Sequence, residues 1–272
     1  MLELGTRTLV MGILNITPDS FADTGARMDP DRALSDALDM VREGVDILDI
    51  GGESTRPGAP PVPADEEWRR VAPVLERLRG RISVPVSIDT YKADVAAKAL
   101  ANGATIVNDV SGLTFDPPLA DVVARAGAAV VLMHHRGRSD DMYARAKYGD
   151  VVSEVIDELT ARVAAARDAG IDPARIIVDP GIGFAKRAAH SMAVLGRLDA
   201  FAAIGRPILS GPSRKSFLRQ AIGDLPPNQR VWGTAAAVTA SVLAGAHIVR
   251  IHDVREMVQV VRVADAIRSA AS

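Results

Sequence analysis

Side chains of the kinds that bind ligands and assist catalysis follow short apolar runs throughout this sequence. Asp89, Asn108 and Asp179 each stand directly after such a run. Two carboxylates and an amide suit a ligand that presents several N–H donors on a planar edge, such as an aminopyrimidine. The sequence therefore predicts a site for a nitrogen heterocycle where several strands end.

A second set of residues has the chemistry of an anion site. Arg250 and His252 alternate at the end of an apolar run, so both side chains point to the same side of a strand. Together with Asn15, Thr55 and Arg56 they offer charge and hydrogen-bond donors suited to phosphate or pyrophosphate. Asn15 can also give one oxygen to Mg²⁺, an ion that keeps several waters and takes ligands from substrate phosphates.

Residues 208–217 pass from a short apolar run through Ser-Gly-Pro into Ser213, Arg214, Lys215 and Ser216. We expect a strand that leads into the first turn of a helix, where free N–H groups and the positive dipole end attract an anion or an electron-rich ring. Lys215 could then hold a ring carbonyl or ring nitrogen. The alternative is that Ser213 only caps the helix and both cations are solvated.

Eight β-rich apolar runs alternate with segments of helical periodicity. The runs are 8–14, 47–50, 84–88, 106–107, 130–133, 176–178, 208–209 and 248–251. The helical segments are 32–43, 66–78, 92–101, 117–126, 151–169, 191–203, 234–244 and 255–269. This pattern predicts a parallel sheet covered by helices, and eight units fit a closed (β/α)₈ TIM barrel formed by residues 1–272 as a single domain. An open doubly wound sheet is the alternative, but the count of eight and the lack of a linker favour the barrel.

In such barrels the active site lies at the C-terminal ends of the strands. The residues at those ends here are mostly polar: Asn15, Asp49, Asp89, Asn108, Asp109, His134, Asp179, Lys215 and His252. A ring of such groups on one rim predicts a functional site. The connections 17–31 and 54–65 exceed the usual length of about 2–6 residues, so we expect them to close over the rim as lids.

Composition excludes several classes of protein. The chain has 272 residues, a formal net charge of -2 and no cysteine. No basic stripe with interleaved aromatic residues is present, so we expect no nucleic acid partner. No apolar run reaches the roughly 18 residues of a membrane span, and the first residues lack the apolar segment of a signal peptide. The absence of cysteine fits a reducing compartment, and we expect a cytoplasmic protein.

Seven ordered blocks resemble the dihydropteroate synthase family over nearly the whole chain. The blocks are MGILNITPDSF (11–21), DIGGESTRPG (49–58), SIDT (87–90), IVNDVSG (106–112), DPGIGF (179–184), SRKSF (213–217) and RIHDV (250–254). Each block alone is a weak signal, but seven in order are highly specific.

The resemblance implies a reaction and a set of residues. The family condenses 6-hydroxymethyl-7,8-dihydropterin pyrophosphate with p-aminobenzoate and releases dihydropteroate and pyrophosphate. It implies that the pterin binds at Asp89, Asn108, Asp179 and Lys215, and that pyrophosphate binds at Asn15, Arg250 and His252, with Mg²⁺ at Asn15. The implied p-aminobenzoate site consists of Phe21, Thr55, Arg56, Pro57, Phe184, Lys215 and Ser216. The residues implied to be catalytic are Asp89, Lys215, Arg250 and His252.

The resemblance also implies a homodimer. The apolar final helix, with Val258, Val260, Val261 and Val263, could supply the contact face. These side chains could equally cover the barrel.

Departures from the family pattern border the p-aminobenzoate side. The first loop has Ala22 and Thr24 where the family usually has Ser and Gly, and His135 stands where Met is usual. We expect His135 to be exposed or to lie behind the ligand-contacting side chains. Ala185 replaces a Gly and disfavours a positive φ.

Two other functions share part of this pattern. A methyltetrahydrofolate:corrinoid methyltransferase would share the Asp/Asn/Asp pocket but would not need Arg250-x-His252, the Ser-Arg-Lys-Ser segment or the Ser-Thr-Arg-Pro loop. A paralogue of the synthase could bind pterin or pyrophosphate with little turnover. The altered loops keep this second alternative open.

Overall fold

The computed structural model describes residues 3–17, 29–55 and 58–271. Eight parallel strands form one sheet in the order β6-β5-β4-β3-β2-β1-β8-β7. The strands are β1 (Leu9–Asn15), β2 (Ile47–Gly51), β3 (Val86–Asp89), β4 (Ile106–Asp109), β5 (Ala129–Met133), β6 (Ile176–Asp179), β7 (Leu209–Ser210) and β8 (Ile248–Ile251). A bridge between Val178 and Ile208 joins β6 to the start of β7 and closes the sheet. The predicted barrel is therefore confirmed, because this bridge joins the two strands that would otherwise be the edges of an open sheet.

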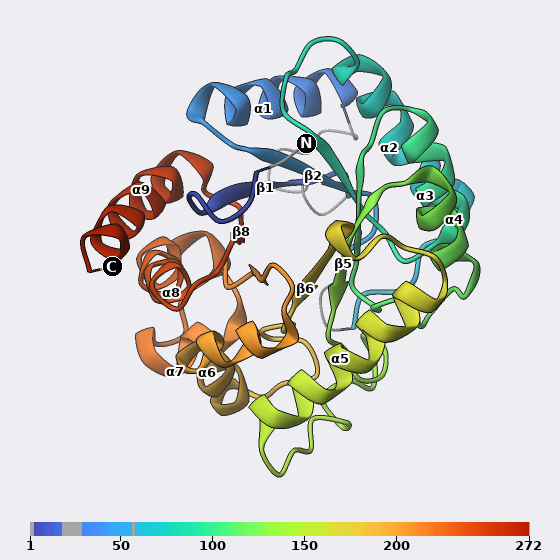
Figure 1. The fold of residues 1–272 in the computed structure, drawn as a ribbon. Coiled ribbons are helices and arrows are strands. Elements are labelled where there is room, and N and C mark those ends of the chain that lie inside the picture. Colours follow the sequence, from blue (N-terminus) through green and yellow to red (C-terminus); the bar gives the residue numbers. More distant parts are fainter. Residues whose placement is uncertain (1–2, 18–28, 56–57, 272) are drawn as a thin grey trace.

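Helices surround the strands as an outer ring (Figure 1). They are α1 (Pro30–Glu43), α2 (Ala64–Leu78), α3 (Ala93–Ala101), α4 (Pro118–Ala126), α5 (Val151–Asp168), α6 (Ala188–Gly196), α7 (Arg219–Ile222), α8 (Val231–Leu243) and α9 (Val254–Ala270). Local chemistry sets several ends. The Asp150 side chain caps α5 by accepting from the N–H of Val152, and Gly44 ends α1 with φ 95°.

Two apolar layers explain why the strands read as nearly continuous apolar runs. Inside the barrel, alternate residues of the strands form one buried cluster: Leu9, Met11, Ile47, Ile106, Val131, Ile177, Leu209 and Ile248. The intervening residues, such as Val10, Leu48 and Val107, belong to a second cluster together with helix residues. Because both faces are buried, the apolar pattern does not alternate with polar residues until each strand reaches its C-terminal end.

Two expected helices differ from the structure. The segment after β7 does not enter a regular helix, because Arg214 has φ 57° and only a short 3₁₀ turn (Ser216–Leu218) and the four-residue α7 follow. The expected anion-binding helix N-terminus is therefore wrong. The expected helix 191–203 is divided at Arg197 into α6 and a 3₁₀ segment (Leu198–Ile204), since Arg197 leaves the helical region with φ −127° and ψ 34°.

A helix must be both long and apolar to cross a bilayer, and this requirement applies to each helix of the described residues. None of them combines enough length with enough apolar character to cross a membrane.

Candidate active site

The strand residues that follow the inner apolar cluster form a polar layer at the C-terminal end of the barrel. Two residues after Ile47, Ile106, Ile177 and Ile248 stand Asp49, Asn108, Asp179 and Arg250, so these side chains share the inner face. Asp89 pairs with Asn108 across β3 and β4. The structure thus brings together the pterin-site residues that the sequence predicted.

Arg250 is the centre of this layer. Its Nε donates to Asp49 Oδ2 at 2.6 Å, and its Nη2 donates to Asp89 Oδ2 at 2.6 Å. Asn108 Nδ2 donates to the same Asp49 oxygen at 3.0 Å. Asp49 therefore orients both Arg250 and Asn108, a role that the sequence did not assign to it. Its position in the DIGGESTRPG block, on a strand end, was the available signal.

Burial perturbs the charges of the polar layer. The pKa of Asp89 is raised to about 7, because burial and the nearby Asp49 outweigh the lowering effect of Arg250. Burial raises the pKa of Asp179 as well, and two carboxylates hold the pKa of Arg250 above its usual range. Perturbed groups of this kind, gathered in one strand-end cluster, are typical of functional sites.

Lys215 links the segments that follow β6 and β7. Its Nζ donates to the carbonyl of Ile182 and lies 4.5 Å from the centroid of the Phe184 ring. Burial lowers the pKa of Lys215 to about 8, although Asp179 opposes this shift. Asp179 in turn accepts from the N–H of Gly181 at 2.7 Å. Lys215, Asp179 and Phe184 therefore lie in one neighbourhood, as predicted.

His252 directly follows β8 and is held by Ser213. The hydroxyl of Ser213 accepts from the N–H of His252 at 3.1 Å and pairs with Nδ1 of His252 at 3.0 Å. With its hydroxyl accepting from the backbone, Ser213 is assigned as the donor to Nδ1, which leaves Nε2 as the protonated nitrogen of the neutral ring. Arg214 forms an ion pair with Asp253, so its charge is already compensated.

Only part of the predicted p-aminobenzoate site can be placed. Phe21, Arg56 and Pro57 lie outside the described residues, as do Ala22 and Thr24 and most of the first long loop. Thr55 is half-buried at the start of the second loop, and Ser216 is exposed at the start of the 3₁₀ turn. A pocket of about 480 Å³ reaches this region, and its lining includes Gly183, Lys186, Ser216 and Phe217.

The departure at His135 is buried, not exposed. His135 is 8% exposed, and its ring lies 5.9 Å from the ring of Phe115 and 5.7 Å from that of Phe184. Burial lowers its pKa to about 4, so the ring is neutral. The expectation of exposure was wrong, while a place behind the predicted ligand wall at Phe184 agrees with the other half of that expectation.

Ala185, which stands where the family usually has Gly, adopts the positive φ that alanine disfavours. Ala185 has φ 47° and is fully buried. A non-glycine residue held there costs on the order of 1–3 kcal/mol, so it persists only where its surroundings enforce the conformation.

Asn15 fits Mg²⁺ as a single protein ligand, with the other ligands supplied by water and substrate. Asn15 ends β1 and pairs with Gly51 of β2. Within the part of the chain that the structure describes, no three His, Asp or Glu side chains form a group that could hold a metal. One amide oxygen suits an Mg²⁺ ion that takes its other ligands from water and substrate phosphates.

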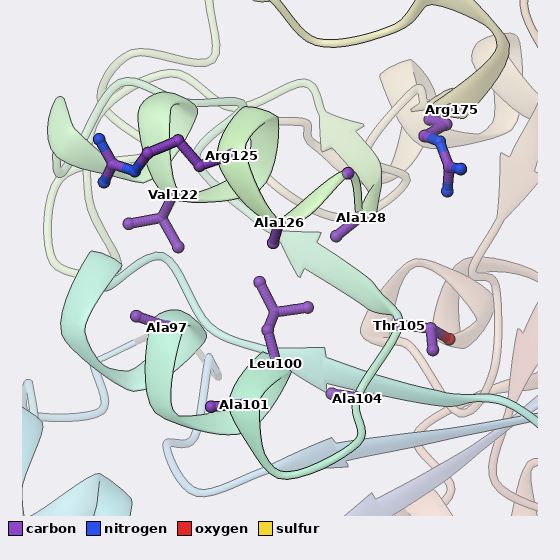
Figure 2. Close-up of a pocket in the computed structure, with 11 residues that line it drawn as sticks. Ala97, Leu100, Ala101, Ala104, Thr105, Val122, Arg125, Ala126, Ala128 and Arg175 are labelled. Carbon is purple, nitrogen blue, oxygen red and sulfur yellow. The ribbon is translucent and has the colours of Figure 1, made fainter.

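A larger pocket lies at the opposite end of the barrel. Its volume is about 560 Å³, and it lies between α3 and α4 (Figure 2). Ala104 and Thr105 precede β4, and Ala128 precedes β5, so the pocket borders the N-terminal ends of the strands. It has no part in the polar layer.

Comparison with known proteins agrees with this geometry. The family described as "Pterin binding enzyme" matches residues 11–252, which is most of the chain. A barrel of this type with an Asp/Asn/Asp cluster at its C-terminal rim thus defines the class, and the chain belongs to the pterin-binding enzymes.

Within that class, the similar proteins are dihydropteroate synthases. The chain is 46% identical to dihydropteroate synthase of Synechocystis sp. over 98% of this chain and 92% of the relative, and 45% identical to that of Bacillus subtilis over 96% and 88%. The Xanthomonas albilineans dihydropteroate synthase with 4-aminobenzoic acid has a TM-score of 0.91, 44% identity and coverage of 97% of this chain and 94% of that one. The Burkholderia cenocepacia enzyme complexed with 7,8-dihydropteroate has a TM-score of 0.88, 46% identity and coverage of 98% and 93%.

Proposed function

We propose that this chain is a dihydropteroate synthase, a transferase that condenses 6-hydroxymethyl-7,8-dihydropterin pyrophosphate with p-aminobenzoate. The observation that carries the proposal is the bonding of Arg250 to Asp49 and Asp89. It places a cationic group beside a carboxylate proposed to bind the pterin, within one polar layer at the strand ends. The identity to dihydropteroate synthases over nearly the whole chain supports the same reaction.

The pterin is proposed to bind at Asp89, Asn108, Asp179 and Lys215. Buried carboxylates accept from the N–H groups of the heterocycle, while Lys215 can donate to its carbonyl or ring nitrogen. Asp49 keeps the amide of Asn108 in place by accepting from its nitrogen. The buried position of these groups excludes water from the ring edge, which strengthens each hydrogen bond.

Arg250, His252 and Asn15 are proposed to hold the pyrophosphate. Negative charge develops on the leaving oxygen as the C–O bond breaks, and the two cationic or donor side chains stabilise it. Mg²⁺ bound with the substrate at Asn15 would supply further charge neutralisation. Arg250 has two carboxylate partners, so pyrophosphate must compete with Asp49 and Asp89 for it.

The amine half of the reaction needs no strong base. The neutral arylamine nitrogen attacks the methylene carbon, the new C–N bond replaces the broken C–O bond, and the amine proton is released. The carboxylate of Asp89 can stabilise positive charge on the pterin during this step. The proposed walls of the amine site are Phe21, Thr55, Arg56, Pro57, Phe184, Lys215 and Ser216.

The test of this function is pyrophosphate release by the purified chain with dihydropterin pyrophosphate and Mg²⁺, with and without p-aminobenzoate. We expect release that requires the amine and yields dihydropteroate, and that stops when a chelator removes Mg²⁺. Pterin binding without amine-dependent release would instead favour the paralogue with little turnover. Methyl transfer from methyltetrahydrofolate to a corrinoid in the absence of pyrophosphate release would favour the methyltransferase.

We also propose that the chain acts as a homodimer through α8 and α9. Val258 and Val261 of the predicted face are buried against the barrel, but Val263 is 61% exposed and Ile267, one turn further along α9, is 52% exposed. Leu243, at the end of α8, is 47% exposed, and Arg268 donates to the carbonyl of Val242 beside it. An exposed apolar stripe of this kind suits a self-complementary contact.

Sedimentation velocity tests the dimer. We expect the wild-type chain to sediment as a dimer and a Val263→Asp/Ile267→Asp variant as a monomer with an unchanged circular dichroism spectrum, because two charges would be buried without partners. A monomeric wild-type chain at micromolar concentration would contradict the proposal.

The synthase itself is proposed to work as one domain in the cytoplasm, in agreement with the absence of cysteine.

A further inference from the structure

The segment between β6 and α6 carries three residues with positive φ in close succession. They are Gly181 at 68°, Gly183 at 84° and Ala185 at 47°. Glycine adopts this conformation without steric cost, but alanine does not. Phe184, the proposed wall of the amine site, lies between the last two. Its position therefore depends on whatever keeps Ala185 in the left-handed region.

Two side chains, one from the same segment and one from the segment before α5, bind the carbonyls on either side of this strained residue. The hydroxyl of Tyr148 donates to the carbonyl of Ala185 at 2.9 Å. The ammonium of Lys186, which is 2% exposed, donates to the carbonyl of Phe184 at 3.2 Å and approaches Nδ1 of His134 at 2.8 Å. The backbone is thus held on both sides of Ala185, at the carbonyl before it and at its own carbonyl.

The two donors are themselves anchored to α5. The carboxylate of Glu158 can only accept, so His134 donates to its Oε2 from Nε2 at 3.0 Å and accepts from Lys186 at Nδ1. Arg136 donates from Nε to Oε1 of Glu158 at 2.9 Å, and its guanidinium lies 4.0 Å from the centroid of the Tyr148 ring. Burial lowers the pKa of His134 to about 4, which keeps the ring neutral and able to accept. We call Lys186, Tyr148, His134, Arg136 and Glu158 the α5 brace.

We propose that the α5 brace compensates for the alanine at position 185 and positions Phe184 for the amine substrate, with Lys186 as its main positioning residue. The inference rests on the proposed synthase function for its substrate. Lys186 acts through the backbone of the Phe184 segment, while Asp89 and Asn108 are on separate strands. Asp179 and Lys215 of the proposed pterin site contact this segment at Gly181 and Ile182. We therefore expect the brace to act more strongly on the amine half of the site than on the pterin half.

Steady-state kinetics of four variants test this inference: Lys186→Met, Ala185→Gly, the double variant that combines them, and Lys98→Met as a matched control. Lys98 is a lysine on α3 that pairs with Asp94, away from the site. We expect Lys186→Met to raise KM for p-aminobenzoate about tenfold, with KM for the pterin pyrophosphate within about twofold of wild type. Glycine at position 185 needs no brace, so the double variant should recover most of the loss. A loss of fold stability alone would not produce this selective change and rescue.

A second measurement does not depend on the proposed function. Hydrogen exchange of the peptide that covers residues 181–187 should be faster in Lys186→Met than in wild type and should return toward the wild-type rate in the double variant. If the wild-type chain shows no amine-dependent turnover, the synthase proposal fails, and exchange alone still decides whether the brace holds the segment. If Lys186→Met does not fold, Tyr148→Phe removes only the hydroxyl that donates to Ala185 and should produce the same changes at smaller size.

Two outcomes would overturn the inference. In the first, Lys186→Met leaves both KM for p-aminobenzoate and the exchange of residues 181–187 unchanged. In the second, KM rises but glycine at position 185 does not restore it, which would show that Lys186 acts on the ligand or on Asp179 and not through the backbone of the segment.

Discussion

Replacing Asp89 with Asn is expected to reduce turnover by about 10²–10³-fold while the barrel remains folded. The substitution removes the negative charge proposed to stabilise the pterin cation, but it keeps a side-chain oxygen that can accept from Arg250. Because Arg250 also retains Asp49, no buried cation is left without a partner. We therefore expect the melting temperature to change by only a few degrees, an effect of about 1 kcal/mol.

The measurement is kcat and KM for both substrates together with thermal unfolding of wild type and variant. The pH dependence of wild-type activity provides an internal check, because the pKa of Asp89 is raised to about 7. If the carboxylate form is needed, kcat/KM for the pterin pyrophosphate should fall as pH decreases below about 7, and Asp89→Asn should lack this limb. A folded Asp89→Asn variant with near-normal turnover would show that the charge is not required.

Replacing Arg250 with Leu is expected to damage both activity and stability. Removal of the guanidinium leaves Asp49 and Asp89 buried without their cation, and breaking a buried pair in this way costs about 3–5 kcal/mol. For a chain of this size the melting temperature should fall by roughly 10 °C. Turnover should fall by about 10²–10³-fold or more, since the leaving pyrophosphate loses its main cationic partner.

The pH dependence of this instability identifies its cause. With Arg250 absent, the pKa of Asp89 in the folded chain stays above its ordinary value, so the folded state binds a proton that the unfolded state releases between the two pKa values. Stability of the variant must then increase as pH falls toward and below about 7 and decrease as pH rises. Thermal unfolding at pH 6 and pH 8 measures this difference. Arg7→Leu is the control, because Arg7 is largely exposed beside Asp46 and its loss should cost less than about 1 kcal/mol at either pH. An equal loss at both pH values would argue against buried carboxylates as the source.

The barrel could be predicted because its strands are buried on both faces. Apolar runs separated by helical periodicity gave eight strands, and each observed strand overlaps one of them. The expected runs stopped short at β3, β4 and β6, where Asp89, Asn108, Asp109 and Asp179 continue the strand. Strand propensity argues against these residues, but pairing with neighbouring strands overrides it at the rim proposed to bind the substrates.

The site was predicted less completely because its contacts join distant parts of the chain. Arg250 was expected to face an anion, yet it also pairs with Asp49, which lies 201 residues earlier. No spacing in the sequence indicates such a pair. Likewise, the burial of His135 depends on Phe115 and Phe184 from two other loops. The positive φ of Arg214 is likewise held by distant residues, because its N–H donates to the hydroxyl of Thr234 and its carbonyl accepts from Arg230. Its pairing with Asp253 removes it from the expected anion site.

The closure of the barrel between β6 and β7 has a mechanical consequence. Ladders of regular pairing join the other neighbouring strands, whereas β6 and the start of β7 meet only at the bridge between Val178 and Ile208 in the described sheet. Two strands joined by a single bridge can separate locally while the pairing of the other strands stays intact. Asp179 ends β6 on one side of this bridge, and Lys215 follows β7 on the other side. The two side chains proposed to hold the pterin thus come from the two neighbouring strands of the described sheet that share the least regular pairing.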